Sequence, residues 1–165
     1  MMPTRANRVQ LIFVLLLMLV LQFYLRPRLW GPRVSPDFLF LGLMLVALRS
    51  SPGIAALAGF LIGLAGDALT PARFGAGMMA NTVVGYVASW ARAVFFADNI
   101  LVNAAFVGAG LWLRDLLTLL LSGGTDRPML AELTVYSPLE ALATAAFALL
   151  VLLASRQWFS VRLDV

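Results

Sequence analysis

The sequence of 165 residues contains no cysteine, no histidine and no lysine, so all 12 of its basic residues are arginine. Without thiolate, imidazole or lysine amine groups, the chain lacks the ligands of most zinc and iron sites and the usual nucleophile–base pairs. P-loops, Schiff bases and Ser-Lys dyads are excluded for the same reason. These absences leave few enzyme classes open, and we expect no catalytic activity, no cofactor and no metal site.

Charged side chains are also scarce, because Asp, Glu, Lys and Arg make up 12% of the chain while 62% of the residues are hydrophobic. An average soluble domain has about 25% charged and roughly 45–50% apolar residues. The net charge of +4 is modest and spread over the whole chain, so a nucleic-acid partner is not supported. The composition predicts an integral membrane protein surrounded by membrane lipids.

Proline, glycine and arginine divide the sequence into six apolar stretches. A membrane-spanning helix needs about 20 apolar residues, so six helices would occupy about 120 residues and leave only loops and tails. We therefore predict an all-α integral membrane protein with one polytopic domain over residues 1–165 and six transmembrane helices. Their expected ranges are about 9–25, 34–51, 53–69, 74–91, 98–121 and 135–155.

The first apolar stretch follows Arg5 and Arg8, which is also how a secretory signal begins. A cleavable signal would continue with small residues, whereas Arg26-Pro27-Arg28 follows here, so we expect a helix that is retained. Six helices place both termini on one side of the membrane. That side holds six arginines against five on the other, and this slight excess favours cytoplasmic termini.

Two of the expected helices begin with the same signal, Ser35-Pro36-Asp37 and Ser137-Pro138-Leu139-Glu140, in which a capping hydroxyl precedes a proline. Glu140 is predicted to complete a capping box with the backbone N–H of Ser137, and Asp37 lies where the helix dipole favours an anion. Capping therefore explains both acids, although a ligand or proton-relay role stays open. We expect Asp98 to cap the fifth helix in the same way.

Three ionisable residues, Asp67, Arg114 and Asp115, do not lie at a helix start. A charge at the centre of a membrane helix costs about 2.5–3.5 kcal/mol, so each should face protein or water. Asp67 is near the end of its helix, where it either bonds to the loop of residues 70–75 or makes a direct functional contact. Arg114 and Asp115 point about 100° apart on a helix, so we expect no contact between them. Asp67 or Glu140 is then the expected partner of Arg114.

Small residues at steps of four form a stripe on the third helix, where Ala55, Gly59 and Gly63 precede Asp67. Such a stripe lets a neighbouring helix backbone approach closely. The sequence Gly63-Leu64-Ala65-Gly66-Asp67 superficially resembles the aspartate motif of intramembrane aspartyl proteases. That motif requires glycine at the position of Leu64, and Asp115 lacks the features of a second catalytic aspartate, so this class is not favoured.

The segment 36–86 carries a family resemblance. Pro36-Asp37-Phe38-Leu39 opens a short helix, Gly59-Phe60-Leu61-Ile62-Gly63-Leu64 follows, and Asp67 and Gly75 come next. This pattern resembles the rod shape-determining protein MreD family. The resemblance implies a fold similar to the six-helix substrate-binding components of energy-coupling-factor transporters, and a location in the bacterial inner membrane.

The resemblance further implies a non-enzymatic scaffold of the cell-elongation machinery. Its partners would be the bitopic protein MreC, the actin-like MreB and the peptidoglycan polymerase and transpeptidase pair. The candidate structural and partner-contact residues are Pro36, Ala55, Gly59, Phe60, Gly63, Asp67 and Arg114.

The alternative function is the vitamin-binding component of an energy-coupling-factor type transporter. Such components usually present an Ala-x-x-x-Ala surface on their first helix, and residues 9–25 contain no alanine. This departure favours the shape-determining scaffold.

Overall fold

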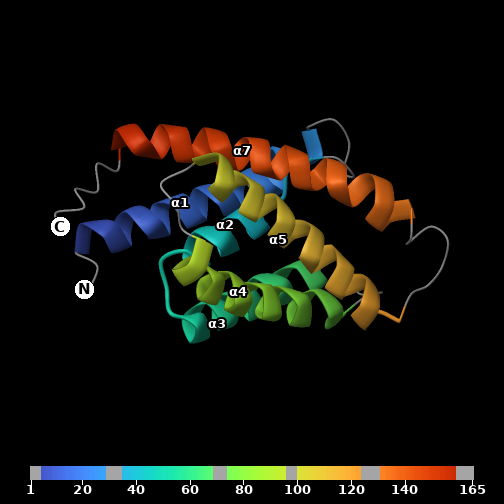
Figure 1. The fold of residues 1–165 in the computed structure, drawn as a ribbon. Coiled ribbons are helices and arrows are strands. Elements are labelled where there is room, and N and C mark those ends of the chain that lie inside the picture. The colour runs from blue at the N-terminus through green and yellow to red at the C-terminus, as the bar shows by residue number, and fades with distance from the viewer. Residues whose placement is uncertain (1–4, 29–34, 69–73, 96–99, 124–130, 159–165) are drawn as a thin grey trace.

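The computed structural model describes residues 5–28, 35–68, 74–95, 100–123 and 131–158. All regular structure in these ranges is helical, which confirms the all-α prediction (Figure 1). The six longer helices are α1 (Arg5–Tyr24), α2 (Phe38–Ala47), α3 (Pro52–Ala68), α4 (Ala76–Phe95), α5 (Ile100–Leu121) and α7 (Ser137–Trp158). Two short segments are the 3-10 turn η1 (Arg26–Arg28) after α1 and the π-helical η3 (Glu132–Tyr136) before α7.

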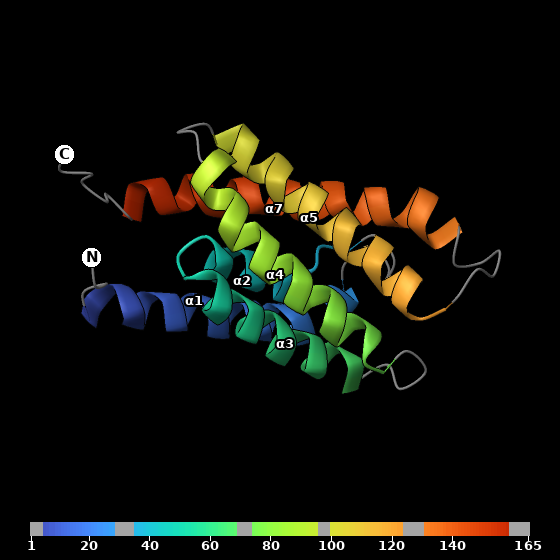
Figure 2. The same ribbon diagram turned by 60° about the horizontal axis from the view of Figure 1, so that its bottom comes forward.

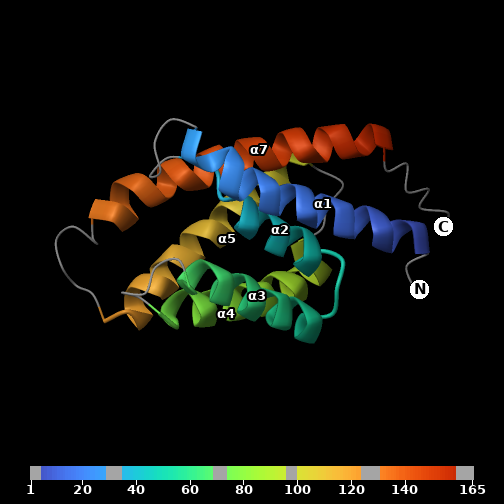
Figure 3. The ribbon, with the colours of Figure 1, turned by 180° about the vertical axis from the view of Figure 1, so that it is seen from behind.

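Helix α2 forms the centre of the bundle, with the other helices around it (Figures 1 and 3). Its sequence FLFLGLMLVA is apolar on every side, as expected of a helix that is buried all round. Phe38 and every residue from Phe40 to Ala47 are buried. Its ten residues are about 15 Å long, which is half of the ~30 Å hydrocarbon core of a bilayer. The helix is thus shorter than the expected range 34–51, because Asp37 caps its first turn and Pro52 already begins α3.

The interior of the bundle is mainly apolar, but its exposed surface is apolar as well, unlike that of a soluble protein. The buried polar side chains of the described residues lie at helix ends or at contacts between helices. They are Ser35, Asp37, Asp67, Asn81, Ser89, Ser137 and Thr144. Large apolar side chains, by contrast, are exposed along the outer faces of α1, α3, α4, α5 and α7. Two stretches, Leu101–Leu121 and Leu133–Val151, are long and apolar enough to cross a membrane by length and composition. This surface is suited to lipid or to other membrane helices.

Helices α3 and α4 lie side by side, and glycine makes their close approach possible (Figure 2). A Cβ atom added at Gly59 would overlap the backbone carbonyl of Asn81, and one at Gly63 would lie 2.5 Å from the Cα atom of Met78. A Cβ added at Gly85 of α4 would likewise lie 2.5 Å from the carbonyl oxygen of Ala55. The small-residue stripe of α3 therefore faces the α4 backbone.

Replacement of Gly59 by leucine should lower the thermal stability of the protein in detergent. The added side chain has no space against the α4 backbone, and overpacking of this kind typically costs about 1–3 kcal/mol. Leu57→Ile on the outward face of α3, where Leu57 is 59% exposed, is the control and should leave the melting temperature unchanged. Equal melting temperatures for both variants would contradict the close contact between α3 and α4.

Candidate functional site

Asp67 joins the end of α3 to the beginning of α4. Its side chain is buried, and Oδ2 accepts hydrogen bonds from the backbone N–H groups of Gly75 at 2.8 Å and Met78 at 2.9 Å. A carboxylate in this place satisfies free N–H groups of the first turn of α4 and interacts favourably with the helix dipole. Gly77 lies directly against Asp67 Oδ1, and a Cβ atom added at Gly77 would overlap that oxygen. Asp67 thus bonds to the end of the following loop, which is one of the two roles expected from the sequence.

A second polar cluster surrounds the beginning of α2, with Asp37 at its centre. Asp37 Oδ1 accepts the backbone N–H of Phe40 at 2.9 Å, which caps α2. Asp37 Oδ2 lies 3.0 Å from Arg114 Nη2 and 3.9 Å from Arg26 Nη1. The backbone N–H of Asp37 donates to Thr144 Oγ1 at 3.0 Å. Asp37 therefore links α2 to η1, α5 and α7.

Two more acids complete this cluster, which we call the ion network and define as Arg26, Asp37, Arg114, Asp115 and Glu140. Arg26 Nη2 donates to Glu140 Oε1 at 2.6 Å, and Arg114 Nε lies 3.0 Å from Asp115 Oδ1. Ser137 Oγ donates to Asp115 Oδ2 at 2.5 Å. The network thus holds η1, α2, α5 and α7 together at one end of the bundle.

Two expectations about Arg114 are wrong. Its partner from another helix is Asp37, whereas Asp67 caps α4 and Glu140 binds Arg26. Arg114 also contacts Asp115, although the two Cβ atoms point about 100° apart. The arginine side chain is long enough to turn back to its neighbour, so the angle between the Cβ directions does not exclude the contact.

The predicted capping box at Ser137 is also wrong. The helical chain runs directly from η3 into α7, so Ser137 and Pro138 lie inside a continuous helical segment. Proline lacks an N–H group and its ring clashes with the carbonyl four residues earlier in an α-helix, a strain that the wider π turn relieves. The Ser137 hydroxyl bonds to Asp115 and Glu140 bonds to Arg26. Asp98, the other expected cap, lies outside the described residues.

The remaining candidate residues have different surroundings. Pro36 is half-buried directly before the Asp37 cap, and Phe60 is 41% exposed on α3, outside the stripe that faces α4.

Sequence reasoning missed Arg26, which counted only as a loop charge, as well as Thr144 and Gln22. Gln22 Oε1 accepts the backbone N–H of Phe38 at 3.0 Å. The sequence signal for Arg26 was its position directly after an apolar stretch, where an arginine needs either water or an acid.

The ion network is suited to holding helices together. In a low-dielectric interior, opposite charges compensate each other, and removal of one partner leaves a costly uncompensated charge. Within the described ranges, no group of three or more Asp, Glu, His or Cys side chains is arranged to hold a metal ion. The geometry assigns these five side chains to internal bonds.

A helical bundle with an apolar exterior and charges turned inward is typical of a membrane protein. The sequence matches the family model described as rod shape-determining protein MreD over residues 4–156. The chain therefore belongs to the MreD family, a membrane protein family with a role in rod-shape determination. No curated protein and no solved structure matches the chain.

Arg114→Gln and Asp37→Asn should each lower the stability of the protein by up to about 3–5 kcal/mol, because each breaks the buried ion pair between Arg114 and Asp37. The remaining charge then keeps only its second contact, Arg26 for Asp37 or Asp115 for Arg114. The double variant should lose less than the sum of the two losses, since both changes remove the same ion pair. Thermal unfolding in detergent measures all three. Arg28→Gln, at an exposed arginine stacked on Tyr24, is the control with little expected loss. Additive losses would show that Arg114 and Asp37 are not energetically coupled.

Proposed function

We propose that this protein is a non-enzymatic membrane scaffold of the bacterial cell-elongation machinery. It would maintain rod shape by associating with an MreC-like bitopic protein and with the lateral peptidoglycan synthesis complex, including MreB and the polymerase and transpeptidase pair. Membership in the MreD family supports the link to rod shape. The observation that carries the scaffold role is that Asp37, Asp115 and Glu140 bond to arginines inside the bundle, while large apolar side chains are exposed on the outer helix faces.

The scaffold would be one polytopic domain over residues 1–165 in the inner membrane, with six spans, cytoplasmic termini and a fold similar to the substrate-binding components of energy-coupling-factor transporters. In support, α1 starts and α7 ends at the same end of the bundle (Figure 1). Five helices have 17–22 residues, or about 26–33 Å, which suits a bilayer. The sixth, α2, would cross only together with the residues on either side of it.

This topology places the turn between α2 and α3 inside the cell and the end of α5 outside. Because the chain has no native cysteine, Ser51→Cys and Ser122→Cys each introduce a unique thiol. An impermeant thiol reagent added to intact cells should label the cysteine at position 122. The cysteine at position 51 should react only after the membrane is permeabilised. The reverse pattern would show that the termini lie outside.

The scaffold role itself is tested by a tagged copy of the chain, expressed in rod-shaped cells that lack the native gene. The wild type should restore rod shape and recover the MreC-like protein from solubilised membranes. Arg114→Gln and Asp67→Asn should reduce both readouts more than Asn103→Ala, because they disturb the packing of the helices that partners contact. Full function of both charge variants would contradict a role of these charges in the assembly.

A wild-type copy that recovers no MreC-like protein would contradict the scaffold proposal. Recovery of a vitamin in equimolar amount with the purified protein would favour the alternative, a transporter component. These two outcomes separate the candidate functions without any variant.

A further inference from the structure

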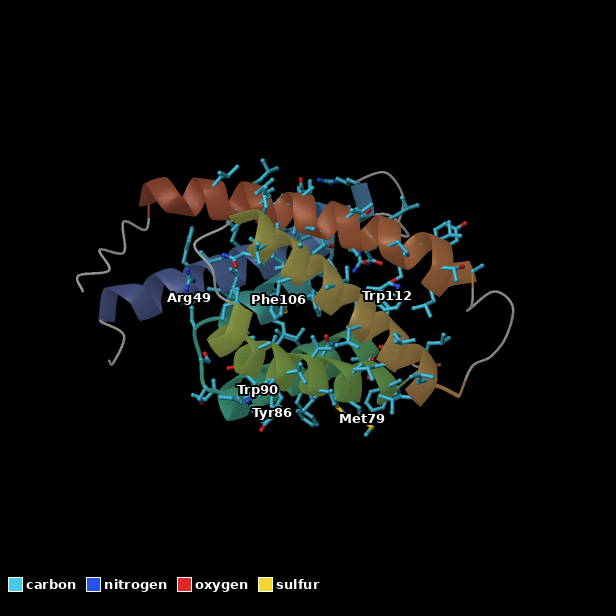
Figure 4. All side chains as sticks on the ribbon, in the orientation of Figure 1. Arg49, Met79, Tyr86, Trp90, Phe106 and Trp112 are labelled. Atoms are coloured by element: carbon cyan, nitrogen blue, oxygen red, sulfur yellow. The ribbon has the colours of Figure 1, made fainter. Side chains whose placement is uncertain are left out.

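The outward face of α4 exposes five large side chains, and four of them form a continuous seam with Val87 beside it. Met79, Val83, Tyr86 and Trp90 follow at spacings of four, three and four residues, and all four are exposed. Figure 4 shows Met79, Tyr86 and Trp90 along the lower side of the bundle at α4, away from α7. This spacing is that of a coiled-coil seam, which contacts one helix crossing at about +20°. We call these four residues the α4 seam.

Tyr86 places a hydroxyl group at the middle of this seam. It is ten residues after Ala76 and nine before Phe95, so it lies about 15 Å from one end of α4 and about 14 Å from the other. Long side chains on a helix lean toward its N-terminus, but a tyrosine is too short to reach that end. Tyr86 is 52% exposed, and its hydroxyl has no hydrogen-bond partner among the described residues.

A hydroxyl at this depth needs a partner that lipid does not supply. In the proposed six-span arrangement, the middle of α4 lies in the hydrocarbon core, where acyl chains offer neither donor nor acceptor. Tyrosine is normally found at the membrane interface, as Tyr24 is at the last position of α1. The large exposed side chains described on α3, and on α7 as far as Leu153, are, by contrast, purely hydrocarbon. The outward face of α4 is therefore the one whose chemistry points to another protein.

Among the described side chains, Trp112 is the other exposed aromatic residue with a polar atom near the middle of a helix, and it lies on α5 (Figure 4). Its outward neighbours one and two turns earlier are Ala109 and Ala105, so no comparable seam of large side chains surrounds it. Trp112 serves as a matched comparison for Tyr86.

We propose that the α4 seam docks the single transmembrane helix of the bitopic partner, with a Ser, Thr, Asn or Gln side chain opposite the Tyr86 hydroxyl. This inference rests on the scaffold function proposed above and adds the contact surface and the chemistry of the partner. The seam is one helix wide, which fits a single-span partner. The glycine contacts of α3 hold α4 from behind and fix the direction of the seam.

Cysteine cross-linking tests which molecule covers the seam. Val83→Cys in the otherwise cysteine-free chain is combined with single cysteines along the transmembrane helix of the MreC-like protein. We expect cross-linked heterodimers at partner positions three to four residues apart, and none with the matched variant Leu142→Cys on the outward face of α7. Cross-linking of two Val83→Cys chains to each other would identify a second copy as the occupant and overturn the proposal. Absence of any cross-link would mean that the seam faces lipid.

Tyr86→Phe tests the hydrogen bond, because it removes only the hydroxyl group of an exposed side chain. Recovery of the bitopic partner should fall about three- to tenfold, as expected for one interhelical hydrogen bond, while the melting temperature of the isolated protein stays unchanged. The controls Tyr24→Phe and Trp112→Phe should recover the partner like the wild type.

The outcomes separate this inference from the proposed function. Equal recovery by Tyr86→Phe and wild type, or a loss with Trp112→Phe instead, would overturn the assignment of the surface and leave the scaffold function intact. If the wild type recovers no bitopic partner, both the scaffold function and its docking seam are wrong.

Discussion

The ion pair between Asp37 and Arg114 determines how the central helix is held. An apolar helix inside an apolar bundle has little to fix its depth or rotation, because dispersion contacts are similar in many positions. The beginning of α2 removes this freedom, since Asp37 binds Arg114 of α5 while its own N–H group donates to Thr144 of α7. Gln22 of α1 binds the next N–H group, that of Phe38. Side chains from three surrounding helices thus bind the residues at the beginning of α2.

The two halves of the bundle use different forces. Around α2, α5 and α7, paired charges join the helices, and their bonds are strong because water is largely excluded. Between α3 and α4, the absence of side chains at Gly59 and Gly63 allows backbone contact, and Asp67 fixes the turn between the helices. The Ser89 hydroxyl donates to the carbonyl of Ser50 at 2.6 Å and ties α4 to the turn before α3. In both halves, the buried polar groups therefore connect one helix to another.

This use of polar groups limits what the protein offers to other molecules. The acids of the ion network and Asp67 are engaged in bonds that hold helices, and the outer surface consists of helix faces. A member of the MreD family built in this way would act through the shapes of those faces and the few polar atoms on them. Association of membrane helices depends on packing and on interhelical hydrogen bonds, which makes a lone hydroxyl on an outward face significant.

Composition and spacing were enough to predict an all-helical protein with an apolar surface, because apolar runs bounded by proline, glycine and arginine have few other folds. The four-residue spacing of Ala55, Gly59 and Gly63 likewise placed these residues on one helix face, since that property is local. The partners that join different helices were not local, unlike the contact between the neighbours Arg114 and Asp115. Asp37 and Arg114 are 77 positions apart, and Arg26 and Glu140 are 114 apart. Only the packing of helices around α2 brings these charged residues together. In addition, the π turn before Pro138 makes Ser137 and Pro138 part of a helix interior, where the sequence predicted a helix start. Helix faces follow from the sequence alone, whereas the pairing of buried charges depends on which helices become neighbours.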